Sequence, residues 1–341
     1  MKIRRNTRVT NLVSFALLGA LLLLAGCALA AEEPAALEPV QMSQPVTGQE
    51  VVDCPGEDAG REELPLTFVD DLGRTITLDA YPERIVSTSP SLTEMLFAVG
   101  AGDTLTGRDD FSVYPEAALA VPSFGSLFAD FPAETILGME PDLVLAAEII
   151  PAEQVQAMEE LGLVVYWQAN PTSFEGLFEN INDLAALVGK TENAEALIAD
   201  LDARVKAVQE LAAGAETTPV VFYELDATDP SNPWTAGSGT FIDLIITEAG
   251  GANAGAALAG DFAQMSVEAL IEQDPQFIIL GDSDFGVTAD IVAARGGWDV
   301  MTAVVTGQVY PFDSNTMSVP GPRLVDGLEQ VIRIIHPELF D

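Results

Sequence analysis

Apolar residues along this chain occur in short runs of strand length that alternate with segments of helical period. The runs include "DLVLAAE" (142–148), "LVVYWQA" (163–169) and "PVVFYEL" (219–225), and amphipathic segments such as "FEGLFENINDLAALVG" (174–189) lie between them. Nearly continuous apolar strands alternating with amphipathic helices are typical of parallel sheets covered by helices. The pattern therefore predicts an α/β fold with mostly parallel sheets.

One unit of this pattern is present twice. The stretch "AETILGMEPDLVLA" (133–146) returns as "VEALIEQDPQFIIL" (267–280). In each copy a glutamate, Glu134 or Glu268, precedes a proline by seven residues, and apolar residues of strand length follow. The duplication predicts two similar α/β lobes in tandem. Taken alone, each glutamate is also explained by a favourable interaction with the dipole of its helix, about 0.3–1 kcal/mol.

A long helix is predicted between the two lobes. Residues 191–213 contain no Pro or Gly and place apolar residues at helical spacing. A helix of this length spans about 35 Å at 1.5 Å per residue. The predicted organisation is an N-terminal lobe at 61–187, a bridging helix at 188–214 and a C-terminal lobe at 215–341.

Shorter signals predict local structure. Residues 66–78 hold two β-type runs around a polar turn with Gly73, a hairpin pattern. Two helix starts show capping-box spacing, Ser91 with Glu94 and Thr240 with Asp243. His336, beside Pro337, is predicted to end a helix.

The first 26 residues have the features of an export signal. Four basic residues precede an apolar run that ends in "LLLLAGC" and is too short for a stable spanning helix. The run resembles a bacterial lipobox, which makes Cys27 the lipid acceptor; an ordinary signal peptide with a chance cysteine is the alternative. Residues 27–60 are predicted to be the lipidated cysteine and a flexible tether. The chain is expected to be exported and anchored by lipid, facing the periplasm or the cell exterior.

Charge and cysteine content narrow the partners. Removing the four basic residues of the signal from the total of 14 leaves ten Lys and Arg against 53 Asp and Glu. Such a surface repels nucleic acid. Solubility, or life in salty water, accounts for most of the excess, and a cationic partner accounts only for particular acids. With Cys27 acylated, Cys54 is the one cysteine left, so no disulfide within the chain is expected.

Enzyme chemistry has little support in the sequence. The single histidine, His336, argues against a His-based triad or a multi-His zinc site. "VGKT" (188–191) lacks the earlier glycine of a phosphate-binding loop, and "DSDFG" (282–286) lacks the later ligands of a calcium loop. Enzymatic activity is therefore not expected, and the sequence indicates no cofactor and no protein metal site.

Five ordered segments resemble one family. They are "PERIVSTSPSLTEMLFAVGAGDTLTGRDDFSVYPEA", "PAETILGMEPDLVLA", "SVEALIEQDPQFIIL", "RGGWDVMTAVVTGQVYPFD" and "PGPRLVDGLEQVIRIIHPELF". Together they resemble the class III, helical-backbone substrate-binding proteins of ABC importers, over residues 64–341. The resemblance implies a monomer that captures cobalamin, a ferric siderophore or haem between its lobes. It also implies delivery to an ABC permease dimer with its ATPase subunits, and lobes that move little on binding.

The resemblance also assigns roles to residues. Glu134 and Glu268 match the segments whose glutamates dock on arginines of the two permease subunits. The expected ligand-binding residues lie in four loops and are Phe111, Phe128, Trp234, Asn315 and Met317.

Aromatic residues in these loops favour a corrinoid, although the loop with Asn315 and Met317 departs from the cobalamin-binding pattern. A ferric siderophore comes next, since an anionic one would have only Arg108 and Arg323 as cationic partners in the expected loops. Haem is a further alternative, with Tyr114 and Tyr310 as candidate axial ligands. A surface lipoprotein that senses or adheres without transport is the alternative of another class.

Overall fold

The computed structural model describes residues 65–127 and 131–340. The expected export signal, Cys27, the tether, Cys54 and Phe128 lie outside this part. The hairpin is confirmed: β1 (Leu66–Val69) pairs antiparallel with β2 (Thr75–Leu78). Among the described residues, no helix combines the length and the apolar character that crossing a bilayer requires.

The N-terminal lobe is built on a five-stranded sheet in which all pairs are parallel. Its order is β5-β4-β3-β6-β7, with bounds β3 (Ile85–Ser87), β4 (Leu105–Asp109), β5 (Ser123–Gly125), β6 (Leu143–Ala147) and β7 (Val165–Gln168). Alternate strand residues pack on opposite faces, as the pleat requires. Ile85 packs with α1 (Pro90–Ala98) and α4 (Phe174–Leu187), whereas Val86 packs with α2 (Ala133–Gly138) and α3 (Ala152–Glu160).

The C-terminal lobe repeats this design with four parallel strands. Their order is β10-β8-β12-β13, with bounds β8 (Val220–Glu224), β10 (Ala252–Asn253), β12 (Phe277–Leu280) and β13 (Val309–Pro311). One face packs on α6 (Phe241–Glu248) and α10 (Leu324–Ile335), and the other on α7 (Val267–Gln273), α8 (Ala289–Ala293) and α9 (Thr302–Thr306). Short strands β9 (Trp234–Ala236) and β11 (Phe262–Gln264) pair antiparallel. The predicted α/β class with parallel sheets is confirmed.

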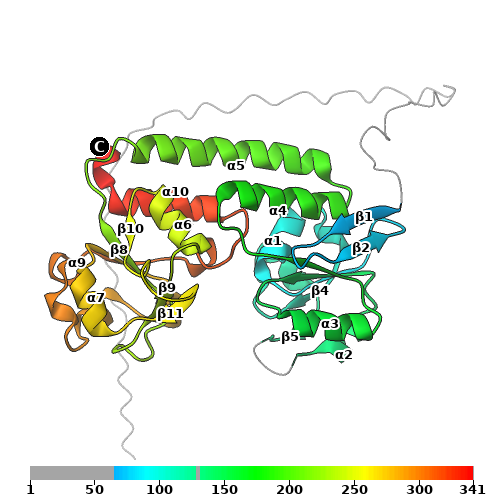
Figure 1. Cartoon of the computed structure of the whole chain (residues 1–341), viewed down its shortest axis with the longest axis horizontal. Helices are drawn as coiled ribbons and strands as arrows, with labels where there is room; N and C mark the ends of the chain where they lie inside the picture. The colour runs from blue at the N-terminus through cyan, green and yellow to red at the C-terminus, as the bar shows by residue number, and fades with distance from the viewer. Residues whose placement is uncertain (1–64, 128–130, 341) are drawn as a thin grey trace, which may run out of the picture. The chain divides into compact units, whose positions relative to one another are not determined.

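The predicted bridging helix is present as α5 (Thr191–Ala212), of 22 residues. It packs on α4 of the first lobe and on α6 and α10 of the second, and it runs along α4 and α10 in Figure 1. Its buried residues, which include Leu201 and Val205, belong to one hydrophobic core that continues through these helices into both lobes. The lobes are therefore joined by packing as well as by the chain.

Six short 3-10 helices complete the described part: η1 (Gly102–Thr104), η2 (Glu116–Ala120), η3 (Ser283–Phe285), η4 (Trp298–Val300), η5 (Ser314–Thr316) and η6 (Pro337–Leu339).

Helix ends agree with the sequence at two of three positions. Thr240 caps α6, accepting a hydrogen bond from the Asp243 N–H, and His336 follows the last residue of α10. The predicted Ser91–Glu94 capping box is wrong. Ser89 caps α1 instead, because Pro90 fits the first helical position, where no N–H is needed. Glu94 is thereby released for another contact.

The duplicated unit is equally regular in three dimensions. Glu134 lies in the first turn of α2 and Glu268 in the first turn of α7. Each helix is followed by a residue with positive φ, Glu140 at 51° and Asp274 at 43°, directly before the proline that leads into β6 or β12. The two copies therefore share a backbone kink as well as a sequence pattern.

A buried charged cluster lies behind the C-terminal sheet. Arg295 donates two hydrogen bonds to the carboxylate of Glu224, with N–O distances of 2.5 and 2.8 Å, and its guanidinium stacks on Trp298. Asp282 is buried beside Glu224, and its Oδ1 has no hydrogen-bond partner in the described chain. Burial raises the pKa of Glu224 to about 7; Arg295 opposes this shift and Asp282 adds to it.

This cluster predicts that the protein loses stability as pH rises from 5 to 7.5. The folded state binds the Glu224 proton more tightly than the unfolded state does. The contribution of this proton to the free energy of unfolding is therefore complete below pH 4.5, the ordinary glutamate pKa, and is lost as the pH rises to about 7. At about 1.4 kcal/mol per pKa unit, the free energy of unfolding falls by about 2–3 kcal/mol. Urea denaturation at pH 5, 6 and 7.5 measures this decrease in the free energy of unfolding. We expect the decrease to be smaller in the Glu224→Gln variant. If the Glu224→Gln variant shows the same dependence of unfolding free energy on pH as the parent, the dependence does not come from Glu224.

Candidate functional site

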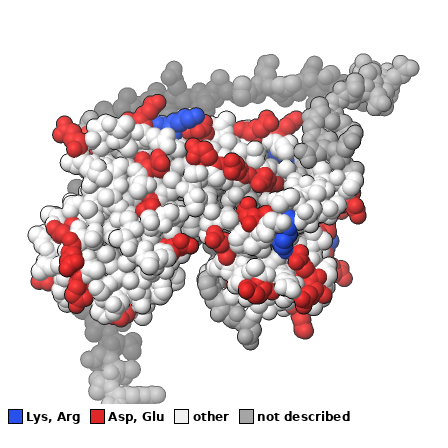
Figure 2. All heavy atoms as spheres, viewed as in Figure 1, with Lys and Arg blue, Asp and Glu red and all other residues white. Residues whose placement is uncertain are grey.

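A cavity of about 800 Å³ lies between the two lobes, and Figure 2 shows the hollow that separates them. Its walls are the loops that follow the carboxyl ends of parallel strands, among them β3, β4 and β6 on one side and β8 and β13 on the other. The strand orders place β3 beside β6 and β8 beside β12. These are the positions where chain direction across each sheet reverses, which is where open α/β sheets bind ligands.

Apolar side chains dominate the wall of this cavity. Phe285 is 87% exposed, Ile149 is 52% exposed and Phe111 is 50% exposed, although each lies in a concave site. Exposed large apolar side chains grouped in a concavity mark a binding surface. The other apolar residues that line it include Val113, Leu127, Leu225, Phe241, Ile242, Phe262 and Val319.

The charge of the wall is entirely negative in the described chain. Asp109, Asp110, Glu148 and Asp261 line the cavity, and no Lys, Arg or His does. Asp109 is buried, and its carboxylate accepts hydrogen bonds from the Phe111 N–H and the Ser112 hydroxyl. Burial raises the pKa of Asp109, which these hydrogen bonds oppose. The arrangement disfavours anionic ligands by like-charge repulsion and by the absence of a cationic partner.

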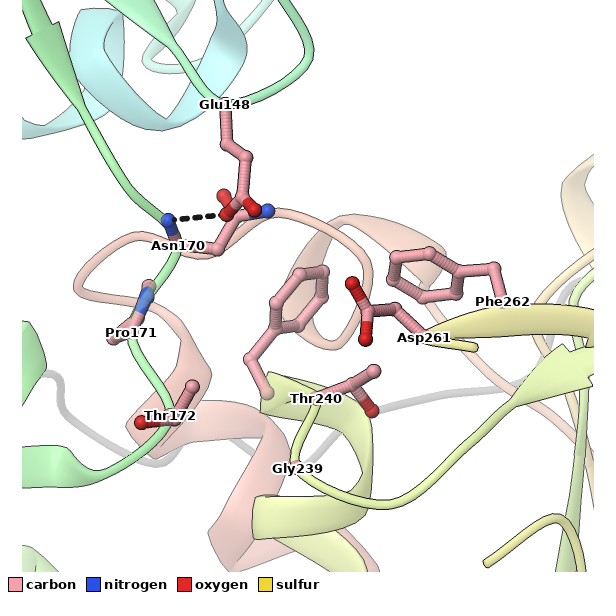
Figure 3. A pocket seen from close by; sticks show the side chains of 9 residues that line it. Glu148, Asn170, Pro171, Thr172, Gly239, Thr240, Asp261 and Phe262 are labelled. Carbon is pink, nitrogen blue, oxygen red and sulfur yellow. Dashed lines mark hydrogen bonds between the residues drawn. The ribbon is translucent and has the colours of Figure 1, made fainter. Parts of the chain in front are cut away.

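A smaller recess of about 90 Å³ extends the same cavity (Figure 3). It shares Glu148, Asn170 and Asp261 with the larger space. Glu148 comes from the N-terminal lobe, where it accepts a hydrogen bond of 2.8 Å from the Asn170 N–H, and Asp261 comes from the C-terminal lobe. Two acceptors from opposite lobes suit a ligand arm that donates hydrogen bonds.

The structure brings two of the predicted ligand-binding residues to the cavity wall, Phe111 and Asn315. Trp234 lies in β9 and is not part of the wall. Met317 contradicts its prediction: its side chain is 0% exposed and belongs to the hydrophobic core, because the short helix η5 turns it inwards. Phe128 lies outside the described residues. Contact between ligand and Phe111 or Asn315 remains a prediction.

The sequence reasoning missed Phe285, the most exposed large apolar residue of the wall. Ile149 and Leu225 were missed as well. The feature that could have identified them is their place just after a strand. Leu225 follows β8 directly, Ile149 lies two residues after β6, and Phe285 lies five residues after β12.

The two arginines considered for an anionic ligand are engaged elsewhere. Arg108 donates through Nε to the carbonyl oxygens of Ala118 and Val121, at 3.0 and 3.2 Å. Arg323 donates through Nε to Glu94 at 2.6 Å. Neither lines the cavity.

The candidate haem ligands are also displaced from the cavity. Tyr114 lies under the guanidinium of Arg323, 3.7 Å from ring centre to Cζ, and the Tyr310 hydroxyl donates to Gln308 at 2.5 Å. His336 is buried at the end of α10, with its Nδ1 3.0 Å from Glu338. No tyrosine or histidine therefore lines the described cavity.

The duplicated glutamates remain exposed. Glu134 and Glu268 lie on the surface at matching places of the two lobes, and neither carboxylate has a hydrogen bond or an ion pair within the described chain. Acidic residues form scattered patches on the visible surface, with few Lys or Arg between them (Figure 2). Position therefore distinguishes these two carboxylates from the rest.

Comparison with known proteins gives consistent matches. The family model for periplasmic binding proteins matches residues 85–316. An ABC transporter substrate-binding lipoprotein of Bacillus subtilis is 30% identical over 284 residues, covering 82% of this chain and 88% of that protein. A cobalamin-binding protein of Halobacterium salinarum is 30% identical over 287 residues, covering 82% of this chain and 76% of that protein.

Structural comparison agrees with the sequence matches. The periplasmic haem-binding protein RhuT from Roseiflexus sp. RS-1, in its apo form, has a TM-score of 0.68 and 28% identity, and the match covers 75% of this chain and 99% of RhuT. The two lobes, the parallel sheets and the cavity between them are thus features of a known class of solute-binding proteins, which are not enzymes. The chain belongs to the periplasmic binding protein family.

Proposed function

We propose that this chain is the extracytoplasmic substrate-binding protein of an ABC importer and that its ligand is a corrinoid. The observation that carries the proposal is the cavity between the lobes, about 800 Å³, walled by aromatic and aliphatic side chains and by carboxylates without a cation. A corrinoid such as cobalamin presents a broad, largely apolar macrocycle and uncharged amide arms. Apolar walls suit the macrocycle, and acceptors such as Glu148 and Asp261 suit amide N–H groups.

The relatives support the transport role and leave several ligands open. One is named an ABC transporter substrate-binding lipoprotein, one a cobalamin-binding protein and one a haem-binding protein. The residue types of the cavity wall support one of these ligands over the others. The described cavity wall has no tyrosine or histidine that could bind the iron of haem, and it has no Lys or Arg that could pair with an anionic siderophore. An uncharged ferric siderophore is the second candidate, because its amide-rich surface meets the same acceptors.

Delivery to the membrane completes the proposal. Glu134 and Glu268, exposed on the two lobes at equivalent positions, dock the loaded protein on cationic groups of two like permease subunits. A lipid on Cys27 keeps the protein, a monomer, close to the permease and its ATPase subunits. Two charge pairs held apart by the helical core also fix the orientation of docking.

A competition experiment tests the choice of ligand. Residues 28–341 are incubated with equal concentrations of cyanocobalamin, an uncharged ferric trihydroxamate, an anionic ferric tricatecholate and haemin, and the retained chelate is identified by absorbance and mass spectrometry. We expect cyanocobalamin to be retained. Retention of the trihydroxamate would agree with the importer role and would make a ferric siderophore, in place of a corrinoid, the ligand. Retention of the tricatecholate or haemin contradicts the reasoning from the charge and ligands of the wall.

A further inference from the structure

A buried ion pair joins the two lobes at the base of the cavity. Glu94 lies on α1 of the N-terminal lobe, and Arg323 directly precedes α10 of the C-terminal lobe. The Arg323 backbone N–H donates to Glu94 Oε1 at 2.9 Å and its Nε donates to Oε2 at 2.6 Å. Their side chains are only 2% and 14% exposed. Both oxygens of one carboxylate are thus held by the opposite lobe.

Two further contacts enclose this pair. The ring of Tyr114 lies 3.7 Å from Cζ of Arg323, a distance typical of a cation–π contact. Gly321 lies so close to Glu94 that a Cβ at this position would be 3.0 Å from Oε1. Arg323 therefore contacts the N-terminal lobe at two points, the carboxylate of α1 and the aromatic ring of the loop after β4.

The same segments form walls of the cavity. Ser91, one turn before Glu94, lines one side, and Pro320, three residues before Arg323, lines the other. Tyr114 belongs to the loop that carries the wall residues Phe111 and Val113. The ion pair therefore joins two segments that each contribute residues to a wall of the cavity.

The loop after β4 is also held by hydrogen bonds from β4 and α1. Asp109 accepts from the Phe111 N–H at 2.7 Å, and Thr93 of α1 donates to the Ser112 hydroxyl at 3.0 Å. Thr93 is the neighbour of Glu94, so one turn of α1 fixes both the loop and the opposite lobe. This is the arrangement expected of a preorganised binding wall.

Because the ion pair is buried, it adds little to the stability of the fold but constrains how the two lobes are oriented. A buried pair gains little over an apolar replacement of the same shape, but removing one partner leaves an unpaired buried charge. The helical core through α5 already joins the lobes, and α5 lines no part of the cavity. A second tie at the cavity base adds a constraint on rotation that α5 alone does not supply.

We propose that Glu94 and Arg323, with Tyr114 against the guanidinium, are positioning residues that fix the angle between the lobes and keep the cavity open at ligand-ready width without ligand. The consequence for affinity rests on the proposed function, whereas the consequence for the lobes does not. Arg323 is accordingly a structural cation, unavailable to an anionic ligand.

The test measures the distance between the lobes. Spin labels are placed at Ala157→Cys on α3 and Ala293→Cys on α8, both exposed, in a chain in which Cys27 and Cys54 are both replaced by serine, and double electron–electron resonance gives the distance distribution. We expect a narrow distribution that ligand does not change. With Glu94→Gln or Arg323→Gln, we expect a broader distribution that ligand narrows again, and a roughly tenfold weaker affinity for cyanocobalamin.

The matched control is Arg204→Gln. Arg204 pairs with Asp326 and Glu329 between α5 and α10, away from the cavity wall. It is expected to leave both the distance distribution and the affinity unchanged. If a Glu94 or Arg323 variant fails to fold, Tyr114→Leu removes only the stacking and is expected to broaden the distribution partially.

Distributions as narrow as the parent's in the folded variants overturn the proposal, as does broadening of equal size in Arg204→Gln. The label experiment without ligand remains decisive if the parent chain does not bind cyanocobalamin. Failure of the ligand proposal and failure of this one are therefore distinguishable.

Discussion

We expect that replacing Glu134 and Glu268 together by alanine abolishes uptake of the ligand and leaves its binding unchanged. Both side chains are exposed in the first turns of α2 and α7, and neither lines the cavity. Close charge pairs across an interface couple by about 1.5–7 kcal/mol each, so losing two pairs lowers productive docking by more than tenfold. The measurement is uptake of labelled cyanocobalamin by cells that express the variant with its permease, beside calorimetric affinity of the purified chain.

The control for this experiment removes two other carboxylates. Glu153 in α3 and Asp290 in α8 are also exposed in first helical turns, one on each lobe. Their double alanine variant is expected to transport normally, although it carries the same change in net charge. Normal uptake by the Glu134/Glu268 variant contradicts docking through these residues and favours a sensing or adhesion role for the cavity.

We expect that replacing Phe111 or Phe285 by alanine weakens ligand binding about 10–100-fold. Both rings lie in the cavity wall with half or more of their surface exposed, on opposite lobes. They are available to cover the two faces of a flat ligand, and truncation leaves the fold intact because neither belongs to a core cluster. Calorimetric titration of each variant with cyanocobalamin measures the loss.

Phe340→Ala is the matched control for the aromatic variants. Its ring is partly exposed and packs under Arg333 at the end of the chain, away from the cavity. We expect its affinity to equal that of the parent. Equal affinities in all three variants would place the binding site elsewhere.

Local patterns were sufficient to predict the fold. The repeated Glu134 and Glu268 units predicted two lobes, and the uninterrupted helical period of 191–213 predicted the bridge, since both features are encoded by neighbouring residues. Where two local solutions competed, the prediction failed. Ser89 and Ser91 flank Pro90, and the preference of proline for the first helical position decided the cap in favour of Ser89.

The site was predicted less completely because its walls depend on distant residues. Phe111, which was chosen from the family resemblance of its loop, lines the cavity, but Met317, only two residues after the wall residue Asn315, turns into the core. Glu94 and Arg323 are 229 positions apart, so no periodicity or motif links them. Phe285 stands among small and acidic residues, and only the strand order shows that its loop faces the cavity.

Calorimetric titration of residues 28–341 with cyanocobalamin is the decisive test of whether the cavity between the lobes binds a corrinoid. We expect saturable binding of one ligand per chain with a submicromolar dissociation constant. An absence of heat and of co-purifying cobalt absorbance at micromolar concentrations would contradict it.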